Sequence, residues 1–320
     1  MNTSACQSLN SETQNLTKDA VAKESGSGAA GRADVIRGLA AVALFALTVP
    51  LTAIALQSGW SALDIAAGRT SIAGFAALAT VLACGWRIPA LRHWPALILV
   101  ACAVAGGFPY LLARAITEVG SGTMGVVLGL IPLATALLSA LLQRQSVHSS
   151  FWFWSGAASV LTLFYFAGLP QTDLLALTGS TLVILLGCLL LAAVGYAFGA
   201  RLANQLGAWQ TICWVQVMAL PVAAFTFGWQ LGQERPQAPS MEGWLALVWL
   251  GLVSQWLGFR FWYRALAVDP VRISQLQLLQ PLLTLAVLTL IAPALVGIHQ
   301  WLFAVAILIC VVTAMRTRQK

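Results

Sequence analysis

RAITEVGSGTMGVVLGLIP, the stretch from Arg114 to Pro132, returns about 150 residues later as RALAVDPVRISQLQLLQP, from Arg264 to Pro281. Both copies lie inside apolar sequence, and 59% of the 320 residues are hydrophobic. Charged residues make up only 8% of the chain, far below the roughly one quarter that is usual in a soluble domain. The repeat therefore predicts an all-α integral membrane protein made of two related halves.

Apolar runs of about twenty residues, the length that crosses a bilayer core, number ten along the chain. The predicted spans are about 36–57, 64–84, 94–114, 119–142, 150–168, 176–200, 208–229, 243–264, 271–292 and 298–315. We therefore expect two five-helix repeats, at 36–168 and 176–315. Because five is odd, the second repeat enters the membrane inverted relative to the first.

The polar leader, residues 1–35, predicts a disordered cytoplasmic tail, and residues 316–320 form a basic cytoplasmic C-terminus. Arg and Lys in short loops stay on the cytoplasmic side. With both termini inside, Arg235 is the only basic residue in the predicted outer loops. The inner face then collects Arg32, Arg37, Arg87, Arg92, Arg144, Arg201, Arg264, Arg272, Arg316, Arg318 and Lys320.

Several short motifs occur in a fixed order and are duplicated. The first span of each half holds an aromatic residue followed by alanine, Phe45-Ala46 and Tyr196-Ala197, at a spacing of about 150 residues. Arg69 lies near the start of span two, in LDIAAGRTSIAG. A longer motif occurs twice, once across spans three to four and once across spans eight to nine. It consists of an aromatic residue, then Arg-Ala-Ile or Arg-Ala-Leu, a short turn, a small polar run and a proline.

With these motifs the chain resembles the drug/metabolite transporter superfamily in its ten-span form with two EamA-type repeats. The resemblance covers about residues 36–315 and implies a carrier of small organic metabolites, such as amino acids, in the bacterial inner membrane. Family members often carry an acidic residue just after spans four and nine. Here those places hold Gln143-Arg144 and Ala292-Pro293, which weakens the case for proton coupling there.

Two arginines inside predicted spans are candidate substrate ligands. Arg69 has two interpretations: its side chain reaches back to the outer surface, or it attracts a substrate carboxylate or locks an outer gate. Arg260 lies near the cytoplasmic end of span eight, where its Cα–Cβ bond leans into the membrane. Arg260 then needs an acceptor, unless it only reaches the interface and is favoured by the helix C-terminus.

Span nine offers amide groups and a proline. Gln277 and Gln280 are candidate substrate ligands, and the alternative is that they only hold neighbouring helices together. Pro281 and Pro132 remove amide donors and should free the carbonyls of Gln277 and Leu128. We expect kinks or gates at Pro50, Pro132 and Pro281.

Many of the 13 tryptophans fall at span ends and predict an interfacial belt. Tyr110, Tyr196 and Trp256 lie deeper and are candidates for the wall of a substrate cavity, although lipid-facing packing is the alternative for each.

Other classes of protein fit the sequence less well. The three histidines lie in predicted loops, no carboxylate lies in the middle of a span, and no metal-ligand spacing occurs, so we expect no enzyme, metal or cofactor. The net charge of +7 is spread over loops rather than gathered in one patch, so we expect no nucleic-acid partner. The sequence predicts an alternating-access exporter whose partners are a small molecule and the lipid bilayer. A passive channel is the alternative, and an intramembrane enzyme ranks below it.

Overall fold

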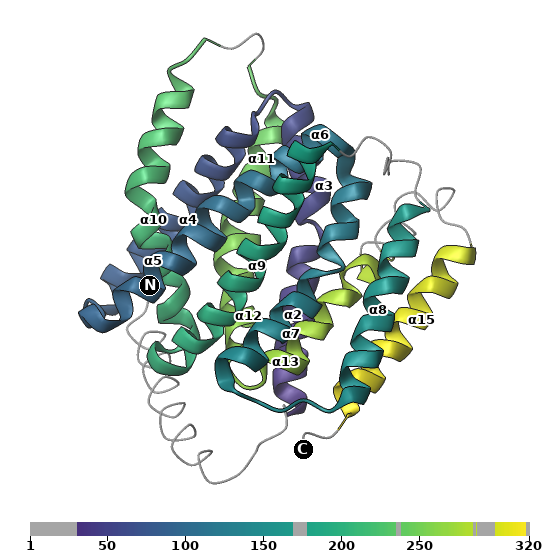
Figure 1. The fold of residues 1–320 in the computed structure, drawn as a ribbon. Coiled ribbons are helices and arrows are strands. Elements are labelled where there is room, and N and C mark those ends of the chain that lie inside the picture. Colours follow the sequence, from purple (N-terminus) through teal and green to yellow (C-terminus); the bar gives the residue numbers. More distant parts are fainter. Residues whose placement is uncertain (1–30, 169–177, 235–237, 284–285, 287–297, 318–320) are drawn as a thin grey trace.

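A computed structural model describes residues 31–168, 178–234, 238–283, 286 and 298–317. Every regular element in these ranges is a helix (Figure 1), as expected for an apolar chain, because a helix satisfies its own backbone hydrogen bonds. The α-helices are α2 (Arg32–Ala46), α3 (Thr48–Gln57), α4 (Ala62–Cys84), α5 (Trp94–Val100), α6 (Phe108–Leu128), α7 (Ile131–Gln143), α8 (Ser149–Ala167), α9 (Gly179–Leu206), α10 (Ala208–Leu231), α11 (Met241–Trp249), α12 (Phe259–Leu266), α13 (Pro270–Ile273) and α15 (Ile298–Arg316). The 3₁₀ helices are η1 (Leu91–His93) and η4 (Ser274–Leu279), and the π-helices are η2 (Ala101–Gly107) and η3 (Leu250–Gly258).

Six helical stretches of the described chain are long and apolar enough to cross a membrane. They are Arg32–Gln57, Ala62–Cys84, Leu91–Ser121, Gly179–Leu206, Ala208–Leu231 and Met241–Leu266, and they coincide with predicted spans one, two, three, six, seven and eight. Predicted spans four, five and ten contain α7, α8 and α15. Predicted span nine lies partly outside the described residues, so the count of ten stays a prediction.

Three helix boundaries differ from the sequence-based expectation. α2 begins at Arg32, before the predicted start at residue 36, and Asp34 stabilises this start by accepting a hydrogen bond from the Gly31 amide at 3.2 Å. The first span is broken at Leu47, three residues before Pro50, which cannot donate a helical hydrogen bond. α6 continues through the predicted outer turn and bends at Gly120 (φ 77°, ψ 166°), a conformation that favours glycine.

The π-helices η2 and η3 occupy equivalent places in the two predicted repeats. Each interrupts a long membrane-spanning stretch about 150 residues from the other, and each is followed by phenylalanine, Phe108 or Phe259. A π-helix inserts an extra residue into the turn and shifts the side chains that follow it to another face. Spans three and eight therefore share the same irregularity.

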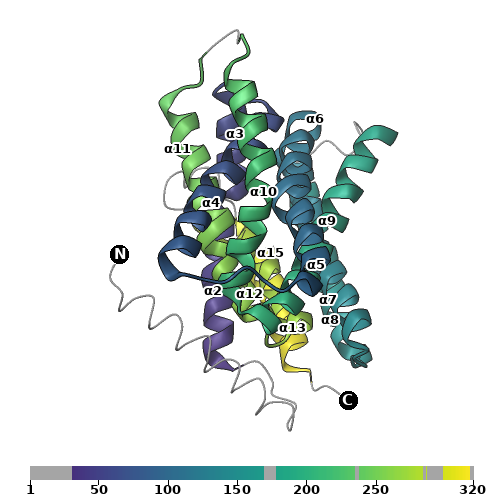
Figure 2. The same ribbon diagram turned by 90° about the vertical axis from the view of Figure 1, so that its left-hand side faces the viewer.

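The helices of the two predicted halves pack against one another in matching pairs. α4 lies along α10, α2 packs on α12, α6 packs on α9, and α8 lies beside α15 (Figure 1). In both views, α2 begins and α15 ends at the same end of the molecule, here called the lower end (Figures 1 and 2). The end of α3, the start of α4, the end of α10 and the start of α11 lie at the opposite, upper end.

Candidate functional site

A small cavity lies where the two predicted halves meet. Its volume is about 30 Å³, which is room for about two water molecules and far too little for a metabolite. The side chains that line it come from nine helical elements of both predicted halves and from Gln280, which directly follows η4. They are Phe45, Thr48, Val49, Arg69, Val104, Phe108, Leu112 and Leu128 from the first half, and Tyr196, Ser254, Phe259, Gln277 and Gln280 from the second.

Arg69 brings a positive charge to this cavity. Its side chain extends from α4, and only 3% of the residue is exposed. The side chain therefore does not reach back to the outer surface, which was one of the two interpretations of the sequence. Its Nε and Nη1 nitrogens are buried, and neither has a hydrogen-bond partner among the described residues. An ionised group at such depth costs about 3 kcal/mol or more if nothing neutralises it.

The second predicted half contributes Tyr196, Gln277 and Gln280 to the lining of the same cavity. The Gln277 side-chain amide donates to the Tyr196 hydroxyl at 3.3 Å, and that of Gln280 donates to the Phe45 carbonyl at 3.1 Å. The Gln277 Oε1 atom is buried and accepts no hydrogen bond within the described chain. The cavity thus holds both an unused acceptor and unused donors.

Aromatic rings form the apolar wall. Phe259 lies 5.3 Å from Phe45 and 5.9 Å from Tyr196 between ring centroids. The sequence pointed to Phe45 and Tyr196 as a repeated pair, but Phe108 and Phe259 were missed. Their equivalent positions, about 150 residues apart, were the signal that could have found them.

A second polar cluster lies beside the cavity, where α4 and α10 meet the π-helices. Thr70 donates to the Ala105 carbonyl of η2, and Gln216 donates to the Gln255 carbonyl of η3 at 3.3 Å. Ala105 lies in η2 and Gln255 lies in η3, about 150 residues apart. The Gln255 side chain joins the two contacts by donating to Thr70 (2.8 Å) and Gln216 (3.2 Å). Most hydrogen-bonding groups of this cluster bond to one another, so we interpret the cluster as a structural link between α4, α10 and the two π-helices.

Pro132 and the carbonyl of Gln277 differ from expectation, whereas the break before Pro50 agrees with it. Pro132 lies in the first turn of α7, where a backbone donor has no helical partner, so it starts a helix rather than bending one. Its carbonyl accepts hydrogen bonds from Ser274 (3.2 Å) and Gln275 (3.3 Å). The backbone carbonyl of Gln277 accepts a hydrogen bond from the backbone N–H of Gln280. The prediction that Pro281 leaves this carbonyl free is therefore wrong.

Three predicted site residues lie away from the cavity. The Arg260 guanidinium lies over the Trp209 ring, 4.6 Å from its centroid, and the Trp256 ring lies 4.9 Å from Trp209. These residues form a separate cluster. Tyr110 is 37% exposed and is not among the residues that line the cavity.

A larger cleft of about 460 Å³ lies one to two helical turns above the cavity along α3 and α6. Gln57, Ser61, Arg114 and Thr117 are among its lining residues. The cleft and the cavity share α3, α4 and α6, so these helices lead from the upper end towards Arg69.

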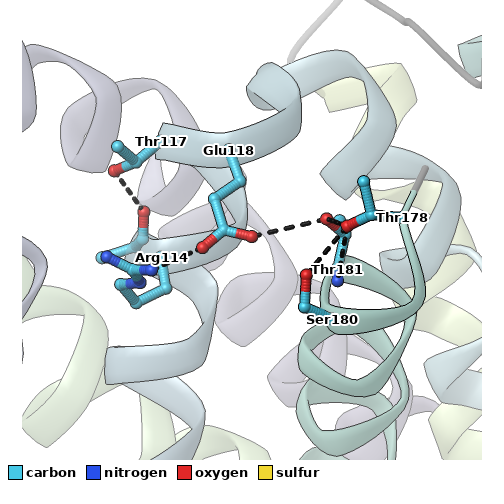
Figure 3. Close-up of polar contacts among 7 residues, drawn as sticks. Arg114, Thr117, Glu118, Thr178, Ser180 and Thr181 are labelled. Atoms are coloured by element: carbon cyan, nitrogen blue, oxygen red, sulfur yellow. Dashed lines mark hydrogen bonds and ion pairs between the residues drawn. The ribbon is translucent and has the colours of Figure 1, made fainter. Parts of the chain in front are cut away.

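Beside the cleft, a polar network joins the two predicted halves at the upper end (Figure 3). Arg114 pairs with Glu118 at 2.5 Å, and the other carboxylate oxygen of Glu118 accepts from the Thr181 hydroxyl at 3.4 Å. Thr181 in turn contacts Thr178, which also contacts Ser180. The contact between Glu118 and Thr181 links α6 to α9 and must break if these helices separate here.

The described residues contain no group of three or more His, Cys, Asp or Glu side chains that could hold a metal. The five described cysteines are free thiols.

Residues 34–167 match the EamA-like transporter family. A Bacillus subtilis (strain 168) protein named "Uncharacterized transporter YdeK" is 33% identical over 282 residues, which is 88% of this chain and 96% of that protein. A solved structure described as "Crystal structure of protein" is 18% identical, with a TM-score of 0.70 over 88% of this chain and 96% of its own. At that identity the likeness shows a shared fold.

Proposed function

Because the chain belongs to the EamA-type transporters of the drug/metabolite transporter superfamily, we propose that it carries small organic metabolites across the membrane by alternating access. Amino acids and related compounds are the proposed cargo, and export is the proposed direction. The observation that carries the proposal is the central cavity, which residues of both halves line and which is too small to hold a metabolite in this conformation. A substrate can enter only if the halves move apart.

The repeated geometry supports an inverted duplication with five spans in each half. The π-helices η2 and η3 lie about 150 residues apart, one in each proposed half. The Ala105 carbonyl of η2 accepts a hydrogen bond from Thr70 on span two, and the Gln255 carbonyl of η3 accepts one from Gln216 on span seven. The proposed duplication relates α2 to α9 and α12 to α6. The contact between α2 and α12 therefore has a counterpart in the contact between α9 and α6. Two halves related in this way favour two conformations that open towards opposite sides.

The upper end corresponds to the proposed outer face of the inner membrane. The described ends of the chain lie together at the lower end, where Arg37 and Arg316 also lie in the terminal helices α2 and α15. Basic residues mark the cytoplasmic side. Both termini are therefore proposed to be cytoplasmic.

Two other functions explain less. A passive channel needs a continuous path, whereas the central cavity holds about 30 Å³. An intramembrane enzyme needs a nucleophile, an acid–base pair or a metal, whereas the cavity lining offers Arg69, two glutamines and hydroxyl groups.

The test is transport by the purified full chain in liposomes. We expect saturable uptake of a labelled metabolite and acceleration by the unlabelled compound on the opposite side, which is counterflow. Flux that rises linearly with concentration and shows no counterflow would instead support a channel.

A further inference from the structure

The central cavity carries an unbalanced positive charge. Among its described lining residues, Arg69 alone is formally charged. The carboxylate on the same helix, Asp64, accepts the Ser61 amide at 2.9 Å as part of the helix cap, and no ion pair of the described residues involves Arg69. An arginine that only held helices together would donate to neighbouring carbonyls. Nε and Nη1 of Arg69 donate to none within the described chain.

The rest of the lining shows what could complete the site. A carboxylate would satisfy the free guanidinium nitrogens of Arg69, and charge-assisted bonds of this kind are the strong ones. The buried Gln277 Oε1 atom calls for a hydroxyl or amide donor on the same molecule. The rings of Phe45, Phe108 and Phe259 would cover an apolar part. A cationic group would find no described carboxylate here and would be repelled by Arg69.

We infer that Arg69 binds the carboxylate of the transported molecule, that this molecule is a small organic monoanion with one hydrogen-bond donor and an apolar part, and that the membrane potential drives its export. The inference rests on the proposed carrier function and narrows the proposed cargo from amino acids to related compounds that carry a carboxylate and no ammonium group.

The direction follows from the charges. The carrier loaded with a monoanion has a neutral site, and the empty carrier has a site with one positive charge. Outward passage of the loaded form followed by inward return of the empty form moves one negative charge outward per cycle. At an interior-negative potential of about 100 mV, this cycle comes to rest when the anion is about 50-fold more concentrated outside.

The test compares molecules that share a carbon skeleton and differ in charge. The purified full chain in liposomes is given phenyllactate (−1), phenylalanine (zwitterion), phenyllactamide (neutral) and phenylalaninamide (+1), with a potassium–valinomycin potential of either sign. We expect saturable counterflow of phenyllactate alone. Its final distribution should be about 50-fold in favour of the positive side at about 100 mV and should reverse with the potential.

Variants then assign the effect to the arginine. Arg69→Gln should raise the phenyllactate concentration needed for half-maximal transport by about 30-fold or more. Arg69→Lys should raise it less, because the positive charge stays. Arg201→Gln removes an exposed arginine outside the cavity and should leave transport unchanged. The melting temperature of Arg69→Gln should not fall, because the change removes a buried unpaired charge. A structural arginine would give a lower melting temperature.

The failures can be told apart. Saturable counterflow of phenylalanine, phenyllactamide or phenylalaninamide without phenyllactate would overturn the inference and leave the carrier function standing. A phenyllactate distribution that ignores the potential, or an Arg69→Gln variant with unchanged half-saturation, would also overturn it. Absence of saturable flux for all four compounds would count against both the inference and the carrier function.

Discussion

Glycines set how closely the central helices approach one another. Gly199 on α9 faces the ring of Tyr263 on α12, whose hydroxyl donates to the Gly195 carbonyl at 3.1 Å. A Cβ atom at residue 199 would lie 2.3 Å from that ring. Tyr263 has no exposed surface and therefore no room to move aside. Small residues at helix contacts give membrane bundles this close packing.

Gly199→Ala should therefore destabilise the fold. We expect a loss of about 1–3 kcal/mol, the usual range for an extra methyl group in a filled core. Thermal unfolding of the purified protein in detergent measures it. Gly228→Ala on α10 is the matched control, because a Cβ atom there meets nothing within 4 Å and alanine favours a helix by up to about 1 kcal/mol. Equal melting temperatures for the two variants would show that the Gly199 contact does not limit packing.

The packing of α6 on α9 combines a rigid contact with a polar one. Below, Gly107 at the end of η2 lets the Leu191 side chain approach, since a Cβ atom there would lie 2.5 Å from it. Above, the only inter-helix bond of the described polar network is the one from Thr181 to Glu118. A single hydrogen bond is worth about 1 kcal/mol, so the upper contact can open far more readily than the glycine contact.

Thr181→Val should make the upper end open more often. Valine keeps the shape of threonine and removes the hydroxyl that donates a hydrogen bond to Glu118. The readout is the rate at which an impermeant thiol reagent labels Gln57→Cys, in the upper cleft, after the six natural cysteines are replaced. We expect labelling to be about two- to tenfold faster. Ser180→Ala removes a hydroxyl that bonds to Thr178 at 2.8 Å and should not change the rate. If both variants label at the same rate, the contact is not a gate.

The whole fold was predictable where apolar length decided it. Predicted spans one, two, three, six, seven and eight correspond to long apolar helical stretches. The π-helices η2 and η3 and the continuation of α6 to Leu128 were not predictable, because they depend on contacts between helices. Arg69, Tyr196, Gln277 and Gln280 were predicted as site residues, and the cavity brings them together, because polar groups in apolar runs stand out.

The three predicted site residues that do not line the cavity share a structural setting. Tyr110, Arg260 and Trp256 all lie in a π-helix or within three residues after one. The extra residue of a π-turn rotates the side chains that follow it, and this rotation could not be predicted from the sequence. Phe108 and Phe259 were missed for another reason, since an aromatic residue inside an apolar run gives no contrast.

The inverted duplication makes one demand on the whole molecule, which is that equivalent positions lie on opposite sides of the membrane. Gln57 ends α3 at the upper end, and Gln205 lies in the last turn of α9 at the lower end, 148 residues later. Both glutamines are exposed. They form a matched pair because the same side chain occurs at both sites.

Single cysteines at these two positions should therefore differ in intact cells. In the variant without natural cysteines, an impermeant thiol reagent should label Gln57→Cys from outside and leave Gln205→Cys unlabelled until the cells are permeabilised. The reason is that five spans separate the equivalent positions, and an odd number of crossings changes the side. Labelling of both residues from the same side would mean an even number of crossings between them. Two conformations that exchange the roles of the halves would then no longer be similar in energy, and alternating access between inverted repeats would lose its structural basis.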